Sequence, residues 1–307
     1  MEVYISGSLA YDRIMDFQGK FQDHILPEKI HILNVSFMVN SLTEKYGGTA
    51  GNIAYTLALL GEKPTILAAV GKDFDNYAQR LTGFNLPLSG LRRIEEEFTS
   101  GCYITTDAAN NQITGFNPGA MKYGSEYDFN GIPPEECLAV VAPGNLDDMT
   151  GYPRKYRECG IKYIYDPGQQ IPVLTGEQIR EAIEGCHILI SNDYELEMIF
   201  QATGLTKDRI LKMDKTIITT LGKKGSHIST SEGETTIPAA PEKVQNDPTG
   251  AGDAYRAGLI KGLVEGRDLE TAAKMGTVCG SFSVECHGTQ EHHFTMEEFW
   301  ERYNQAF

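Results

Sequence analysis

The chain has no long apolar segment and comparatively few basic residues. No run within its 307 residues approaches the roughly 20 apolar positions needed to cross a bilayer. The N-terminus lacks a basic segment followed by a long apolar one, so we expect a cytoplasmic protein with no membrane partner. Lys and Arg total 27 against 42 Asp and Glu, a formal net charge of −15. This balance argues against a nonspecific nucleic-acid partner, because such binding depends on basic side chains that neutralise phosphates.

Two other absences narrow the chemistry. The six cysteines stand singly, with no Cys-x-x-Cys pair, so we expect reduced, mostly buried thiols and no zinc site. The chain also has no Gly-x-x-x-x-Gly-Lys-Ser/Thr sequence, which disfavours a P-loop kinase.

A glycine-rich turn near the C-terminus is the most informative segment present. It reads Asp247-Pro248-Thr249-Gly250-Ala251-Gly252-Asp253, and small and apolar residues follow at helical spacing. Amides of such a turn can converge on an oxyanion, and a helix N-terminus adds positive partial charge. Gly250, Ala251 and Gly252 are therefore predicted to form an anion hole, with Asp253 facing an attacking hydroxyl. Taken alone, Asp253 is better explained as an acidic residue that complements the helix dipole.

Three further segments strengthen the first interpretation. Gly47-Gly48 and Asn52 open a second apolar helical pattern, which ends at Gly61. Two more segments, 192–195 and 220–225, each begin where a candidate strand stops. In this order the four segments resemble the motifs of the PfkB, or ribokinase-like, family of carbohydrate and nucleoside kinases. The resemblance covers nearly the whole chain.

Apolar runs alternate with helical patterns along the chain, as is typical of parallel strands joined by crossover helices. We predict strands at 3–6, 65–70, 138–142, 162–165, 188–191 and 216–220, and helices at 73–81, 147–159, 177–184 and 194–204. With the resemblance, this pattern predicts a single α/β domain over 1–307: a ribokinase-like three-layer sandwich with a central, mostly parallel sheet flanked by helices. In the family, segments at about 13–46 and 98–123 form a small β lid; an edge extension of the main sheet is the alternative.

The resemblance implies an ATP-dependent transferase with an alcohol as acceptor. It makes Asp253 the base that accepts the hydroxyl proton. It also implies that Asn192 and Glu195 act around Mg²⁺ and the phosphates, often through water; a helix cap is the alternative for this pair. Thr220, Gly222 and Gly225 are predicted to contact ATP, and the same glycines would also suit a hairpin turn. Asp247 and Thr249 are candidates for a monovalent cation such as K⁺, as in several members.

The acceptor site is expected on the N-terminal side of the chain. The family places a sugar-binding carboxylate at Asp12, which could grip a diol, with Ser8, Gly47, Gly48 and Asn52 completing the pocket. Viewed alone, Asp12 would be a surface loop residue.

The expected acceptor follows from the tail at 286–294 and the Ser8-to-Asp12 spacing, which look most like the adenosine kinase branch. This resemblance implies that the enzyme phosphorylates the primary, 5′-type hydroxyl of a nucleoside. The first candidate is adenosine, which would be converted to AMP in purine salvage. A ribose or fructose kinase and a catalytically silent nucleotide-binding protein remain open. Phe37, Phe116 and Met121 are candidates for a purine slot, whereas His292 and His293 are expected at the surface or at a helix cap. Relatives pair through the lid or stay monomeric, so a homodimer through the lid is an expectation.

Overall fold

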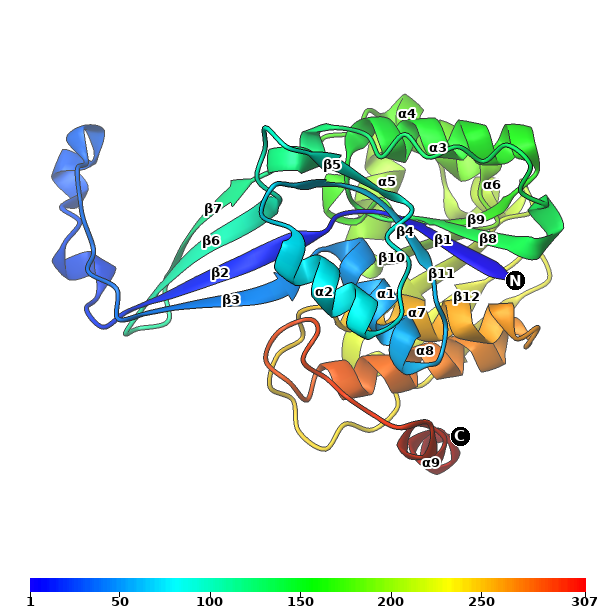
Figure 1. Cartoon of the computed structure of the whole chain (residues 1–307). Helices are drawn as coiled ribbons and strands as arrows, with labels where there is room; N and C mark the ends of the chain where they lie inside the picture. The colour runs from blue at the N-terminus through cyan, green and yellow to red at the C-terminus, as the bar shows by residue number, and fades with distance from the viewer.

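The computed structural model describes residues 1–307 and has a nine-stranded sheet at its centre (Figure 1). The strand order is β13-β12-β11-β10-β9-β8-β1-β4-β5. All neighbours are parallel except at one edge, where β11, β12 and β13 pair antiparallel. The strands are β1 (Glu2–Ser6), β4 (Thr65–Gly71), β5 (Leu91–Ile94), β8 (Cys137–Val141), β9 (Lys162–Tyr165), β10 (Ile188–Asn192), β11 (Thr216–Thr220), β12 (Ser226–Ser229) and β13 (Glu234–Ile237).

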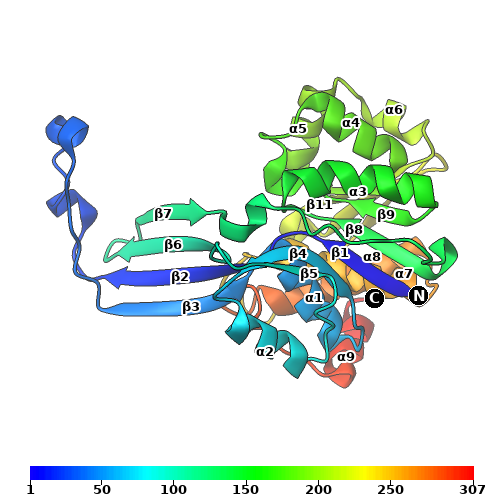
Figure 2. The same ribbon diagram turned by 45° about the horizontal axis from the view of Figure 1, so that its top comes forward.

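Helices cover both faces of this sheet (Figure 2). One face carries α1 (Thr49–Leu59), α2 (Asp75–Gly83), α7 (Ala251–Val264) and α8 (Leu269–Ser283); the other carries α3 (Leu146–Cys159), α4 (Gly176–Gly185), α5 (Asp193–Thr203) and α6 (Lys207–Leu211). Side chains alternate along each strand, so Val3 and Ile5 join the first core while Tyr4 joins the second. A last helix, α9 (Met296–Ala306), packs against α8 through a third, smaller core.

A separate four-stranded sheet projects from one side of the body (Figures 1 and 2). Its order is β3-β2-β6-β7, with β2 (Ala10–Phe17), β3 (Ser41–Gly47), β6 (Ser100–Asp107) and β7 (Gln112–Asn117). We call this sheet the lid. The two segments expected to form a lid fall on it. Between β2 and β3 the chain runs out to a tip with two 3-10 helices, Phe21–Asp23 and Pro27–Ile32.

The fold class expected from the sequence is confirmed, and each of the six predicted strands and four predicted helices is present. The helix expected at 73–81 begins at Asp75. The hairpin expected around 220–225 is also confirmed, because β11 and β12 pair antiparallel. Among the elements that the sequence did not reveal are β5, β13, α8 and α9. No helix combines the length and apolar character that a membrane span requires, and all six cysteines are free, although only Cys137, Cys186 and Cys279 are buried.

Candidate active site

The glycine-rich turn forms the start of α7. Gly250 is its N-cap and has a left-handed backbone with φ of 80°. A Cβ at this position would also lie 3.0 Å from the side chain of Thr289, so only glycine fits without strain. Asp253 lies in the first helical turn, as predicted. The amides of the turn and this carboxylate therefore line the same cavity, whose volume is about 660 Å³.

A hydrogen bond joins the two glycine-rich helix starts. Asn52, in the first turns of α1, donates from Nδ2 to Oδ2 of Asp253 at 2.8 Å. Its Oδ1 accepts from Nε2 of Gln290 at 3.1 Å, and the same Nε2 lies 2.6 Å from the hydroxyl of Tyr77. These contacts fix which way the Asn52 amide points. Asn52 was predicted to bind the acceptor, and the structure engages both ends of its amide with protein groups.

The environment of Asp253 raises the pKa of its carboxyl group towards neutral pH. Burial raises its pKa to about 6, while Arg256 and the hydrogen bond from Asn52 act in the opposite direction. A carboxylate with such a pKa is ionised at neutral pH yet basic enough to accept a proton. These are the properties that a general base requires.

A buried ion pair that the sequence did not reveal lies beside this carboxylate. Nε of Arg256 is 2.5 Å from Oδ2 of Asp166, and both side chains are almost fully buried. A Cβ on Gly252 would lie 2.7 Å from Nη1 of Arg256, so the guanidinium sits against the turn itself. Burial raises the pKa of Asp166, with Arg256 opposing the shift. The other oxygen, Oδ1, has no hydrogen-bond partner in the protein.

Asn192 and Glu195 form a reciprocal helix cap at the start of α5. The Glu195 amide donates to Oδ1 of Asn192 at 2.7 Å, and the Asn192 amide donates to Oε2 of Glu195 at 2.9 Å. The capping alternative is therefore present in the structure. Both residues also line the cavity that contains Asp253 and Asp166, so the cap lies in the wall of this cavity.

The loop between β11 and β12 closes another wall of this cavity. Thr220, Gly222 and Gly225 all line it, as does Lys223. The lining thus gathers segments that follow β9, β10 and β11, at the carboxyl ends of parallel strands, where ligands of open α/β sheets bind.

The residues predicted for the acceptor lie outside the lining of this cavity. Asp12 is on β2, and its Oδ2 would be 2.8 Å from a Cβ placed on Gly47, so a glycine there makes room for the carboxylate. Burial raises the pKa of Asp12, opposed only by the charge of Lys45. Gly48 is the N-cap of α1, and Oγ of Ser8 accepts from the Thr49 amide at 3.0 Å. Only Asn52 links this group directly to Asp253.

Asp247 is held by backbone groups. Its Oδ1 accepts from the Thr249 amide at 2.9 Å and its Oδ2 from the Gly288 amide at 3.1 Å. Burial would raise the pKa of Asp247, but these hydrogen bonds outweigh it and lower the pKa below its usual value. The protein contains no cluster of three or more His, Cys, Asp or Glu side chains suited to a metal ion.

The prediction for His292 was wrong, whereas His293 is exposed as expected. His292 is only 1% exposed, and its Nε2 lies 3.0 Å from the Thr56 hydroxyl of α1. Burial and the neighbouring His293 lower its pKa to about 4, so it is neutral at neutral pH. It anchors the tail that presents Gln290. Phe37 also differs from expectation, because it packs against Phe17 and Phe21, with ring centroids at 4.8 and 5.1 Å, by the distal end of β2.

The class of protein follows from this arrangement, because a carboxylate beside the amides of a glycine-rich turn at a helix N-terminus is suited to phosphoryl transfer to an alcohol. The family model for pfkB family carbohydrate kinases matches residues 11–295, and the chain belongs to this family of phosphotransferases.

Several named relatives are similar over nearly their full length. A nucleoside kinase from Methanocaldococcus jannaschii is 35% identical over 283 residues, covering 90% of this chain and 91% of the relative. One from Methanothermobacter thermautotrophicus is 30% identical, covering 84% of each chain. A solved structure of Burkholderia thailandensis nucleoside kinase in complex with inosine superposes with a TM-score of 0.85 at 34% identity, covering 99% of this chain and 98% of the other.

Replacing Asp253 by Asn should stabilise the protein at neutral pH. A folded-state pKa raised from 3.8 to about 6 means that the folded state loses stability as pH rises through this range. The isosteric amide removes that penalty and can still accept from Asn52. Thermal unfolding at about pH 7.5 should show a gain of about 1–3 kcal/mol, shrinking as pH falls towards 4.

The matched control is Asp247→Asn, because the pKa of Asp247 is lowered and the sign reverses. That variant should be less stable than the wild type at neutral pH. An Asp253→Asn protein that is destabilised to the same degree would contradict the raised pKa.

Proposed function

We propose that the chain is an ATP-dependent nucleoside kinase that phosphorylates a primary, 5′-type hydroxyl, with adenosine as the first candidate acceptor. The observation that carries the proposal is the hydrogen bond from Asn52 to Asp253, which holds a carboxylate with a pKa of about 6 beside the amides of the glycine-rich turn. The nucleoside kinases at 35% and 34% identity support a nucleoside over a simple sugar, and the inosine complex of one of them points to purines.

In the proposed reaction, the acceptor hydroxyl gives its proton to a carboxylate oxygen of Asp253. The alcohol oxygen forms a bond to the γ-phosphorus of ATP as the bond to the β-phosphate bridging oxygen breaks, and ADP leaves with that electron pair. Amides of Gly250, Ala251 and Gly252 stabilise the charge on the equatorial oxygens. The guanidinium of Arg256, held against Gly252, adds a fixed positive charge beside them.

Mg²⁺ bound with ATP would neutralise phosphate charge during transfer. The residues present fit such an ion, because the orphan Oδ1 of Asp166 is buried in the cavity wall that also contains Asn192 and Glu195. Asp166, Asn192 and Glu195 would hold it, in part through water, since Mg²⁺ keeps several waters and needs few protein ligands. We further propose that Asp247 and Thr249, behind the turn, take part in binding a monovalent cation such as K⁺; the lowered pKa of Asp247 keeps its carboxylate ionised.

An acceptor panel tests the proposed function. ADP release should be measured with adenosine, inosine, ribose and fructose at fixed ATP and Mg²⁺. We expect kcat/KM for the nucleosides to exceed that for the sugars by about 10²-fold or more, because only nucleosides bring a base as an extra binding group. A sugar preference would show a carbohydrate kinase of the same fold, and no turnover with any acceptor would show a silent nucleotide-binding protein.

Asp253 also sets the expected pH dependence. Only the ionised carboxylate can accept a proton, so kcat/KM should rise with pH and level off above about 6. Asp253→Asn should lower kcat by about 10²–10⁴-fold and abolish this rise. Nucleotide binding, followed by calorimetry, is the control that should persist in the variant. A pH profile unaffected by the substitution would contradict the role of Asp253 as base.

We also propose that the chain pairs with a second copy through the lid. Leu42 and Ile113 are 65% and 46% exposed and lie on one face of the lid, in the row that contains Met15 and Thr105. Leu42→Glu should convert a dimer to a monomer in sedimentation velocity, because a charge cannot be buried without a partner. Thr43→Glu, on the opposite face, is the matched control. A monomeric wild-type chain at micromolar concentration would contradict the proposal.

A further inference from the structure

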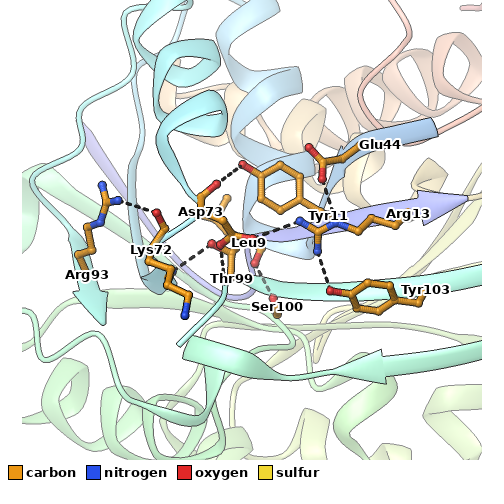
Figure 3. Close-up of polar contacts among 11 residues, drawn as sticks. Leu9, Tyr11, Arg13, Glu44, Lys72, Asp73, Arg93, Thr99, Ser100 and Tyr103 are labelled. Carbon is orange, nitrogen blue, oxygen red and sulfur yellow. Dashed lines mark hydrogen bonds and ion pairs between the residues drawn. The ribbon is translucent and has the colours of Figure 1, made fainter. Parts of the chain in front are cut away.

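Arg13 ties three strands of the lid to the body (Figure 3). Its Nε donates to Glu44 on β3 at 2.9 Å, its Nη1 to the hydroxyl of Tyr103 on β6 at 3.0 Å, and its Nη2 to Oδ2 of Asp73 at 3.1 Å. The guanidinium also lies over the ring of Tyr11, 5.0 Å from its centroid. The side chain is only 15% exposed, so these contacts are partly shielded from solvent.

Asp73 is the body's half of this contact. It lies between β4 and α2, and its Oδ1 accepts from the amide of Thr99, just before β6, at 2.7 Å. Its carbonyl oxygen accepts from the hydroxyl of Tyr11 on β2 at 3.1 Å. The two lid strands β2 and β6 are therefore both fastened to one residue. Burial would raise the pKa of Asp73, but the hydrogen bonds from Thr99 and Arg13 lower it, so the carboxylate is charged.

Asp12 and Arg13 point to opposite faces of the lid, because successive side chains alternate along a strand. Asp12 pairs across the sheet with Lys45 and Cys102, and Arg13 with Glu44 and Tyr103.

The Asp12 face is turned towards the catalytic turn. Lys45 donates to the carbonyl oxygen of His287 at 2.7 Å, and Thr289, two residues later, packs against Gly250. A rotation of the lid about its root would thus move Asp12 relative to Asp253 and would separate Arg13 from Asp73.

We propose that the Arg13–Asp73 ion pair is a positioning contact that fixes the angle of the lid and thereby holds Asp12 at the acceptor. No other ion pair joins a lid strand to the body. Asp12 lies on β2, so its position depends on the strand that carries it. The proposal rests on the proposed function for the acceptor role of Asp12.

The test is Arg13→Gln in the full chain, with acceptor and ATP titrated separately. Asp12 would be displaced but Asp253 and the ATP loop would not. KM for the acceptor should therefore rise about tenfold, while KM for ATP and kcat change less than about twofold. Arg93→Gln is the matched control, because Arg93 makes ion pairs only within the body, with Asp75 and Glu95. It should leave all three parameters within about twofold of the wild type.

A second variant isolates the ion pair from the fold of the lid. Asp73→Asn retains an oxygen for the Thr99 amide and removes only the charge that faces Arg13. It should reproduce the rise in acceptor KM, and the double variant should be no worse than either single one. Effects that add in the double variant, or that fall equally on ATP and acceptor, overturn the proposal.

Hydrogen exchange of the ligand-free protein provides a readout that needs no turnover. Amides of β2 and β6 near the lid root should exchange faster in Arg13→Gln and in Asp73→Asn, but not in Arg93→Gln. Unchanged exchange in both Arg13→Gln and Asp73→Asn also overturns the proposal. If the wild type phosphorylates no acceptor, the proposed function fails, while the exchange experiment still decides whether the ion pair sets the lid.

Discussion

The site depends on one hydrogen bond between residues 201 positions apart, from Asn52 to Asp253. It joins the start of α1 to the start of α7, two helices that pack on the same face of the sheet. Each helix starts at a glycine with positive φ, Gly48 or Gly250, which lets the preceding chain approach closely. Without this bond, Asp253 would remain in the first turn of α7. Its carboxylate would then lack the hydrogen bond that orients it relative to the preceding amides.

The same region shows how buried charge is arranged for chemistry instead of stability. Asp253, Asp166 and Arg256 bring two carboxylates and one guanidinium into one cavity wall. Burial raises the pKa values of both carboxylates, and the one guanidinium opposes this shift without cancelling it. With two carboxylates and one guanidinium, the cavity wall favours the binding of a further cation or of a proton. Proton acceptance at Asp253 and a cation near Asp166 both relieve the imbalance, which is consistent with a phosphotransferase that brings a metal with its nucleotide.

The sequence predicted those features that a local pattern defines. The glycine turns, the strand ends and the Asn192–Glu195 cap are encoded within a few residues, and the structure contains all of them, with the cap and the turn at Gly250 lining one cavity. Asp166, Arg256 and Gln290 were missed because their partners are distant in the chain; an Asp directly after β9 was the one signal that could have drawn attention to Asp166. His292 was wrong for the same reason, since only the packing of the tail under α1 buries a residue that looks solvent-exposed in isolation.

The lid shows how one strand can serve two purposes. Because side chains alternate, β2 directs Asp12 to the face beside the glycine-rich turn and the adjacent Arg13 to the opposite face, where it contacts Asp73 of the body. The proposed acceptor carboxylate and the side chain that holds the strand thus belong to consecutive residues on opposite faces of the sheet. A carboxylate on a mobile loop would lose side-chain and backbone freedom on binding, whereas one on a fastened strand is ordered in advance. In the proposed function, the position of the Asp12 carboxylate at the acceptor is therefore set by the strand that carries it.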